Sequence, residues 1–227
     1  MVDSNKYGFV GLGDMGGPMA ANVARGGFQL IVYDKAGTEN RAPSGTELGI
    51  GIEDVAREAQ IVFVSVPDAE ASLDVARSLV AVEDRDTRTV INLSTVGVEA
   101  TGSIVKTLAD SGIDYVDAPV SGGKAGAIRG TVTVMWSGSA EQMELIRPVL
   151  DSFSGSVFYV GATPGQGQAM KLLNNYLSAV AMTATSEAVA FGLSHSLDMK
   201  VMMDVANVST GQNSATQDKF PNRILTS

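Results

Sequence analysis

Short apolar runs alternate with amphipathic stretches over about the first 160 residues of the chain. Residues 61–66, Ile-Val-Phe-Val-Ser-Val, are nearly all apolar, which is typical of a strand buried on both faces. The pattern predicts strands at 7–10, 28–34, 61–66, 88–93, 113–117, 131–136 and 156–160. It predicts helices between them at about 15–25, 52–59, 69–82, 98–110 and 139–151. This alternation favours an α/β fold with a parallel sheet covered by helices on both faces.

The pattern changes after residues 161–165, Gly-Ala-Thr-Pro-Gly. Residues 167–194 are predicted to form one long helix, which is apolar on nearly every side and should therefore be buried on several sides. A shorter helix at 198–208 and a polar turn at 209–211 follow. These elements are too few to enclose a core of their own. We therefore predict two domains, 1–162 and 163–227, the second a partial all-α domain, and a homodimer or homotetramer with the 167–194 helix in its interface.

A glycine motif lies where the first predicted strand meets the first helix. Gly11 allows a tight turn, Gly13 lets a pyrophosphate approach the backbone, and Gly16 lets the helix pack closely on the sheet. The spacing alone is weak, because it arises by chance about 0.3 times in a chain this rich in glycine. Its place between strand and helix predicts a Rossmann-type doubly wound sheet that binds a dinucleotide. The alternative is a glycine-rich turn in another kind of α/β protein.

An acidic residue closes the second predicted strand, where a ribose ligand is expected. Asp34 should accept hydrogen bonds from both ribose hydroxyls and repel a 2′-phosphate, which favours NAD over NADP. Lys35 and Arg41 lie close enough in sequence to weaken that preference.

Composition excludes several other classes of function. The net charge of −9 argues against nucleic acid as the main partner, because a phosphate backbone needs a basic surface. With no cysteine and a single histidine, His195, the chain has no thiolate chemistry, no Cys-ligated zinc and no histidine metal cluster. Polar residues such as Thr183 and Glu187 interrupt the apolar stretch 176–193, so we predict no membrane span. A soluble cytoplasmic protein without a signal peptide is expected.

Reactive groups gather at predicted strand ends and on the long helix. Residues 121–123, Ser-Gly-Gly, offer consecutive N–H groups and a hydroxyl, a suitable receptor for a carboxylate, although a plain glycine loop has the same sequence. Lys171 and Asn175 lie four residues apart and so share one face of the helix. A lysine in a mostly apolar helix is either solvated near the helix end or has a shifted pKa and a chemical role.

Taken together, three stretches resemble the β-hydroxyacid dehydrogenase family, which includes 3-hydroxyisobutyrate dehydrogenase and tartronate semialdehyde reductase. Residues 11–22 are similar to its cofactor motif, residues 117–123 to its substrate motif, and residues 165–175 to its catalytic helix motif. The resemblance spans nearly the whole chain. It implies an oxidoreductase that transfers a hydride between NAD and a small 3-hydroxy acid.

The resemblance also implies a role for each matching residue. Lys171 is the general acid and base, and Asn175 orients the substrate and the lysine. The substrate-binding residues are Ser121, Gly122, Gly123 and Asn174. The cofactor-binding residues are Gly11, Leu12, Gly13, Asp14, Met15, Gly16, Asp34, Val66, Pro67 and Thr95, with Thr95 near the nicotinamide. No metal site is expected.

Other functions remain open at this point. Imine reductases usually lack a lysine at the place of Lys171, and 6-phosphogluconate dehydrogenases carry a histidine at the place of Asn174, so both are less favoured. A catalytically silent nucleotide-binding or dimerisation module is the alternative that is not an enzyme. Family members carry a longer helical domain with a Lys-Asp-Leu segment, which is missing before Ser227, so we expect a truncated form.

Overall fold

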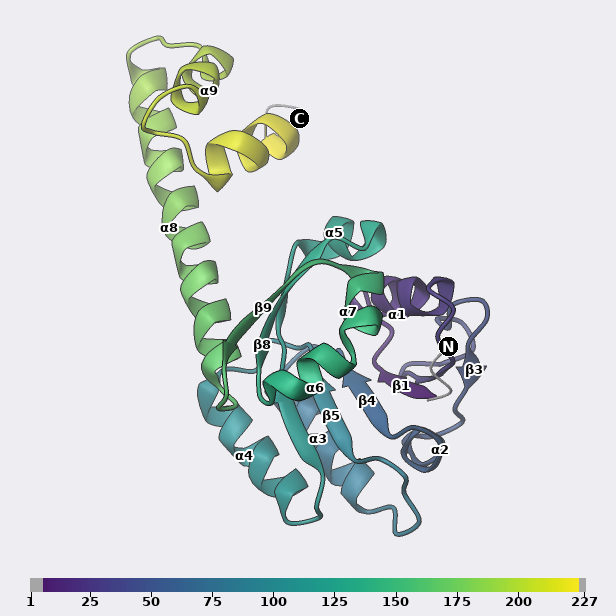
Figure 1. Ribbon diagram of the computed structural model, residues 1–227. Helices are drawn as coiled ribbons and strands as arrows, with labels where there is room; N and C mark the ends of the chain where they lie inside the picture. The colour runs from purple at the N-terminus through teal and green to yellow at the C-terminus, as the bar shows by residue number, and fades with distance from the viewer. Residues whose placement is uncertain (1–5, 225–227) are drawn as a thin grey trace. The chain divides into compact units, whose positions relative to one another are not determined.

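The computed structural model describes residues 6–224, and the chain divides into two compact units, Met1–Lys171 and Leu172–Ser227 (Figure 1). The strands, all in the first unit, are β1 (Tyr7–Val10), β2 (Leu30–Tyr33), β3 (Glu47–Leu48), β4 (Ile61–Val64), β5 (Thr89–Asn92), β6 (Asp114–Asp117), β7 (Val120–Ser121), β8 (Val132–Ser137) and β9 (Ser154–Gly161). Its helices are α1 (Gly16–Arg25), α2 (Ile52–Glu58), α3 (Ala69–Val80), α4 (Val98–Ala109), α5 (Gly123–Arg129), α6 (Ala140–Leu145) and α7 (Arg147–Phe153).

The strands form one sheet in the order β3-β2-β1-β4-β5-β6-β8-β7, and β9 pairs with β8. Neighbouring strands from β3 to β6 are parallel, so the α/β fold class is confirmed. The prediction of a parallel sheet is wrong at the far end, where β8 runs antiparallel to both β6 and β7. The strand order reverses between β1 and β4. Ligands of open α/β sheets bind at the carboxyl ends of the strands beside such a reversal.

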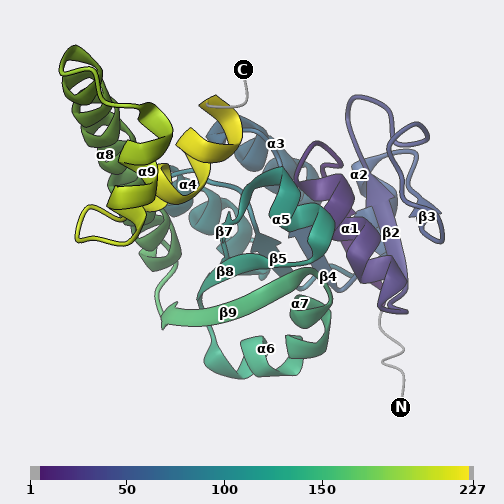
Figure 2. The same ribbon diagram turned by 90° about the horizontal axis from the view of Figure 1, so that it is seen from above.

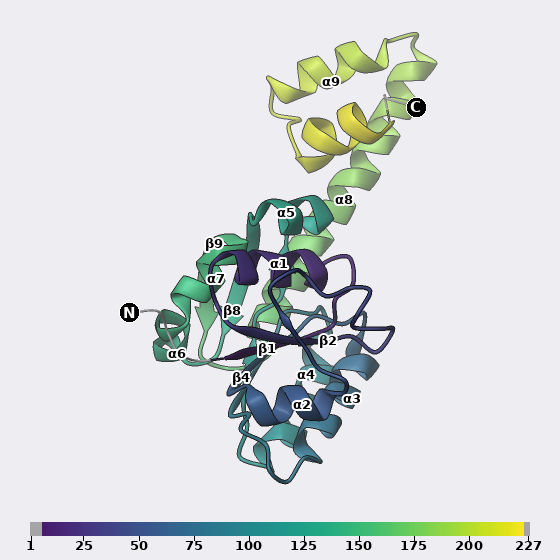
Figure 3. The same ribbon diagram turned by 90° about the vertical axis from the view of Figure 1, so that its right-hand side faces the viewer.

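Two apolar layers cover the two faces of the sheet. Helices α1 and α7 lie on one face, and α2, α3 and α4 lie on the other (Figure 3). The first layer packs around the fully buried side chains of Phe9, Phe63 and Trp136. The second packs around Val62, Leu79 and Leu108. Burial on both faces explains why the central strands are apolar without alternation.

Three local features differ from the predicted elements. The predicted helix at 139–151 is two helices, α6 and α7. Pro148, in the first turn of α7, has no N–H group to continue the backbone hydrogen bonds of α6. Helix α5 was not predicted, since Gly123 and Gly126 lower its helix propensity. The short strands β3 and β7 were also missed, because two residues carry no detectable period.

Helix α8 (Gln166–Ser194) begins in the first unit, and Leu172–Ser227 contains the rest of it. This second unit also contains α9 (Met199–Asn207) and the π-helix η1 (Ala215–Ile224). A small core forms within it from Val189, Met203, Ala215 and Phe220. The prediction of only one long and one short helix after residue 163 is therefore wrong for 215–224. Pro221 and a polar composition hid that helix from the pattern.

Among residues 6–224, α8 is the one helix long and apolar enough to cross a membrane by length and composition. A single helix of this kind is weak evidence for a span. Its first turn also donates hydrogen bonds to Asp117 and Ser137 of the sheet unit. The absence of a membrane span stays a prediction.

Candidate functional site

The glycine turn between β1 and α1 has the geometry that dinucleotide binding requires. Gly11 has a φ of +92°, and a Cβ there would overlap the carbonyl oxygen of Ser65. A Cβ on Gly16 would overlap the carbonyl oxygen of Gly11, so this glycine lets α1 start against the turn. A Cβ on Gly13 would meet no heavy atom of another residue within 4 Å, so its surroundings are open. The open position lies where a pyrophosphate would approach the backbone and the N-terminus of α1.

Asp34 lies just after β2, beside this turn. Its Oδ2 accepts a hydrogen bond of 2.6 Å from Leu12 N, and its Oδ1 accepts one of 2.8 Å from Ala36 N. Arg41 Nη1 is 3.6 Å from Asp34 Oδ2. The carboxylate is therefore fixed next to the glycine turn, where a ribose ligand is expected, and a guanidinium lies beside it.

The carboxyl ends of β4 and β5 continue the same edge of the sheet. Val66 N donates a hydrogen bond of 2.9 Å to Ser94 Oγ, which joins the loops that follow the two strands. Val66 is half-buried, whereas Pro67 and Thr95 are exposed. Parallel strands thus place these three predicted cofactor residues at one edge with the glycine turn.

The Ser121–Gly123 turn joins β7 to α5, and α5 lies alongside α1 (Figure 2). Gly122 and Gly123 have φ values of +134° and +61°, which few other residues adopt. Lys124 Nζ lies 2.6 Å from Asp14 Oδ1 in the glycine turn, and Asn22 Nδ2 of α1 donates a hydrogen bond of 2.7 Å to Ala127 O. The fold therefore brings the predicted substrate turn next to the predicted pyrophosphate turn.

Lys171 is half-buried in the second turn of α8, at the end of the first compact unit. Burial lowers the pKa of its ammonium group. Asn174 and Asn175 follow in the same helix, belong to the Leu172–Ser227 unit and are exposed. A lysine with a lowered pKa can take up and release a proton closer to neutral pH than an ordinary lysine.

Two buried polar residues have no role in the sequence-based prediction. Asp117, the last residue of β6, and Gln168, in the first turn of α8, are both fully buried. They are joined by a hydrogen bond of 2.6 Å from Gln168 Nε2 to Asp117 Oδ1. The one available signal was their position inside the 117–123 and 165–175 motifs, since a polar residue that is buried there needs hydrogen-bond partners.

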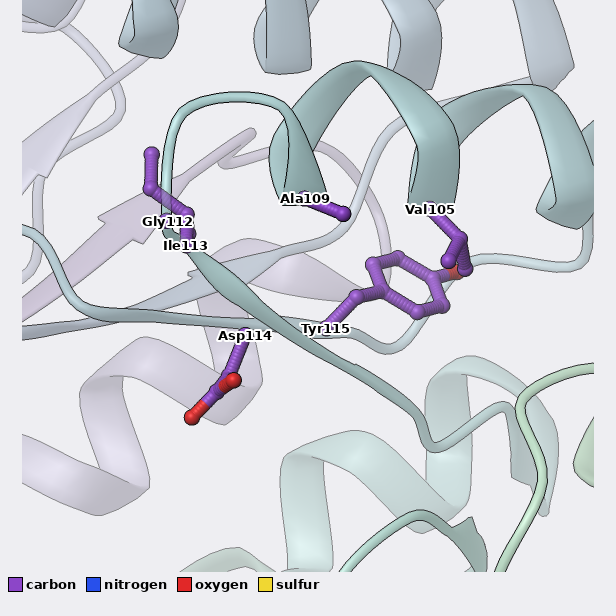
Figure 4. Close-up of a pocket in the computed structure, with 6 residues that line it drawn as sticks. All are labelled: Val105, Ala109, Gly112, Ile113, Asp114 and Tyr115. Carbon is purple, nitrogen blue, oxygen red and sulfur yellow. The ribbon is translucent and has the colours of Figure 1, made fainter.

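A hollow of about 290 Å³ lies elsewhere, between the end of α4 and the start of β6 (Figure 4). It is lined by Val105, Ala109, Gly112, Ile113, Asp114 and Tyr115. Since β6 begins at Asp114, the hollow is at the amino end of the strand. The candidate site is at the opposite, carboxyl edge, so this hollow is not part of it.

Comparison with known proteins matches both parts of the chain. The family described as the NAD binding domain of 6-phosphogluconate dehydrogenase matches residues 6–161. The family described as NAD-binding of NADP-dependent 3-hydroxyisobutyrate dehydrogenase matches residues 165–227.

Individual proteins agree with these matches. A 2-(hydroxymethyl)glutarate dehydrogenase of Eubacterium barkeri is 34% identical over 99% of this chain and 76% of its own length. The Mycobacterium tuberculosis 3-hydroxyisobutyrate dehydrogenase structure with L-serine has a TM-score of 0.84 and 28% identity, over 96% of this chain and 75% of that one. Psf3 in complex with NADP+ and 2-OPP has a TM-score of 0.78 and 30% identity, over 92% and 75%.

Proposed function

Because the chain belongs to the β-hydroxyacid dehydrogenase family and is an NAD(P)-dependent hydroxyacid dehydrogenase, we propose that it transfers a hydride between NAD and a small 3-hydroxy acid. Lys171 is the general acid and base in this proposal. The observation that carries it is a half-buried lysine with a lowered pKa, three residues after Gln168, which is bonded to the carboxyl edge of the sheet.

The proton chemistry falls to Lys171. In alcohol oxidation the neutral amine of Lys171 accepts the proton of the substrate hydroxyl, while the hydride leaves the carbon that bears this hydroxyl. In reduction the ammonium group returns the proton to the carbonyl oxygen. Bound NAD supplies the hydride acceptor. A cation beside the substrate oxygen also stabilises the charge that develops there in the transition state.

Substrate binding is assigned to groups that hold a carboxylate and a hydroxyl. The Ser121–Gly123 turn would take the carboxylate through its hydroxyl and backbone N–H groups. Asn175 lies one turn after Lys171 on the same face of α8, where it would orient both the hydroxyl and the lysine. Asn174 would contact the substrate as well.

Asp34 supports NAD over NADP in this proposal. Its buried carboxylate follows β2, where the ribose 2′-hydroxyl would bind in this proposal, and a 2′-phosphate there would meet a like charge. Arg41 at 3.6 Å partly offsets that repulsion. Psf3 was solved with NADP+, so both cofactors belong in the test.

A panel of substrates and cofactors tests the proposed function. 2-(Hydroxymethyl)glutarate, 3-hydroxyisobutyrate and L-serine would each be offered with NAD+ and with NADP+, and reduction would be followed at 340 nm. We expect turnover of at least one 3-hydroxy acid, with kcat/KM about tenfold higher for NAD+, a difference of about 1.4 kcal/mol. NADPH-dependent reduction of a cyclic imine, without oxidation of any hydroxy acid, would contradict the proposal.

The exposed apolar side chains of α8 support a homo-oligomer. Leu173, Tyr176, Leu177, Val180 and Phe191 are each between 46% and 69% exposed. Such a surface on a long helix is typical of a subunit interface. We expect sedimentation velocity to give a dimer or tetramer, and the paired change Leu177→Glu with Val180→Glu to dissociate it. Leu145→Glu, at an exposed leucine of α6, is the control and should leave the oligomer intact. A folded wild-type monomer would contradict the proposal.

A further inference from the structure

The Gln168 side chain uses every hydrogen-bonding position of its amide. Its Oε1 accepts from Val96 N at 2.9 Å and from Gly97 N at 3.1 Å. Its Nε2 donates to Ser94 O at 3.0 Å and to Asp117 Oδ1 at 2.6 Å. An amide has two donors and one oxygen with two lone pairs, so all four are satisfied. The partners also fix its orientation, because a flipped amide would direct donors at the two N–H groups.

These four bonds join segments that are far apart in sequence. Residues 94–97 follow β5, Asp117 ends β6, and Gln168 lies in the first turn of α8. Ser94 extends the connection to a fourth segment, since its hydroxyl accepts from Val66 N at the end of β4. Gln168 and these partners, here called the Gln168 bridge, all lie within the Met1–Lys171 unit.

Asp117 anchors the α8 side of the bridge. Its Oδ2 accepts hydrogen bonds from Gly165 N at 3.1 Å, Gln168 N at 2.9 Å and Ser137 Oγ at 3.2 Å. Ser137 Oγ accepts in turn from Gly167 N at 3.0 Å. These acceptors satisfy N–H groups at the start of α8 that have no partner within the helix. A carboxylate at this end is also favourable with respect to the helix dipole.

The helix cannot shift away from these partners without breaking several buried bonds. A Cβ on Gly167 would come within 2.7 Å of Met135 O and 2.9 Å of Asp117 Oδ2, so the backbone of α8 lies directly against the sheet. Lys171 follows Gln168 by three residues and so lies on a neighbouring position of the same helix face. The direction in which the Lys171 side chain extends from α8 therefore depends on the Gln168 bridge.

We propose that Gln168 is a positioning residue, which holds the Thr95 segment beside the cofactor edge and the Lys171 turn of α8 in one fixed relation. The inference rests on the proposed roles of Lys171 as the proton carrier and Thr95 as a neighbour of the nicotinamide. Hydride and proton leave adjacent atoms of the substrate, so the two segments must keep their spacing. A misplacement of about 1 Å at a reacting centre lowers rates by about 100-fold.

The test replaces Gln168 by methionine, which keeps the length of the side chain and removes all four bonds. Gln168→Glu is the second variant: it keeps an acceptor for Val96 and Gly97 but places an oxygen against Ser94 O and Asp117. Gln166→Met is the matched control, because Gln166 is an exposed glutamine of the same turn whose Oε1 accepts from Thr163 N. Circular dichroism establishes that each variant is folded.

We expect Gln168→Met to lower kcat by about 10- to 100-fold on the best hydroxy acid of the panel, with the Kd for NADH changed less than about threefold. Hydrogen–deuterium exchange should rise in the peptide containing Val96 and Gly97, whose amides lose their acceptor. Gln168→Glu should lower kcat as well. Gln166→Met should match the wild type in all three measurements.

A double-mutant comparison with Lys171→Ala separates this inference from the proposed function. If Gln168 acts through Lys171, adding Gln168→Met to Lys171→Ala lowers the residual rate less than about threefold. If Lys171→Ala keeps wild-type turnover, the proposed function fails, whatever Gln168 does. If Lys171→Ala is inactive while both Gln168 variants keep wild-type kcat and exchange, the positioning role is wrong. A rise in KM and in the Kd for NADH with kcat unchanged would also overturn it.

Discussion

Replacement of Lys171 by alanine is expected to lower turnover by about 10²- to 10⁴-fold, the range that a positioned general acid or base contributes. Binding of NADH should remain nearly unchanged, because in our proposal the glycine turn and Asp34 hold the cofactor, whereas Lys171 contacts the substrate. Initial rates and a fluorescence titration with NADH measure the two effects separately.

The pH dependence follows from the direction of the pKa shift. Burial lowers the pKa of Lys171 from its ordinary value of 10.5, because it disfavours the ammonium form. Oxidation needs the neutral amine, so its rate should rise with pH through this lowered pKa. Reduction needs the ammonium, so its rate should fall through the same pKa. Lys171→Ala should remove both dependences.

The same shift predicts the effect of Lys171 on stability. A lysine whose pKa is lowered by folding destabilises the native state; this cost is complete below the folded pKa and disappears as the pH rises from there to the unfolded value of 10.5. Lys171→Met should therefore melt no lower than the wild type at pH 7. Lys106→Met, at an exposed lysine of α4, is the control and should leave both turnover and melting unchanged. For the Lys171→Ala variant described above, equal losses of turnover and of NADH binding would mean that the lysine has a structural role.

Alanine at Gly16 and at Gly13 should have opposite consequences. Gly16→Ala places a Cβ against the carbonyl oxygen of Gly11, where only backbone movement can relieve the overlap. We expect the free energy of unfolding to fall by about 1–3 kcal/mol or more and the melting temperature to fall by several degrees. Gly13→Ala meets nothing within 4 Å, so the melting temperature should hold while the affinity for NADH falls by at least about tenfold.

Gly102→Ala provides the control for both variants. Gly102 is an exposed residue of α4 at which an added Cβ would meet nothing within 4 Å. Alanine there should raise stability by about 0.5–1 kcal/mol through helix propensity alone, with no effect on NADH binding. Thermal melts and NADH titrations of the three variants check the prediction. If Gly13→Ala binds NADH as tightly as the wild type, the pyrophosphate does not lie over this turn.

The apolar pattern predicted the parallel part of the sheet because burial on two faces leaves continuous apolar runs such as Ile61–Val64. It could not predict the reversal of β8, because strand direction depends on the connection through α5. That helix carries two glycines and shows no strong periodicity. The η1 helix was missed for a related reason: its few apolar residues, such as Phe220, pack on a small core that forms only with α8 and α9.

The candidate site could be proposed from the sequence where the chemistry depends on local spacing. The glycine turn, Asp34 and Lys171 are each recognisable within a short motif. The Gln168 bridge was not, because each of the four bonds of the Gln168 side chain joins residues from 51 to 74 positions apart, and nothing in the sequence pairs a glutamine with Asp117. A fully buried amide can be recognised as a connector only when its four partners are known.

The order of synthesis bears on the edge of the sheet that Asp117 occupies. Asp117 is made 20 residues before its donor Ser137 and 51 residues before Gln168. The strands up to residue 161 can therefore pair, and the helices between them can pack, before the N–H groups of α8 are available to donate to this carboxylate. A chain emerging from the ribosome in sequence order completes the glycine turn between β1 and α1 early. The edge that carries the proposed catalytic lysine is the last part of the first unit that can reach its native state.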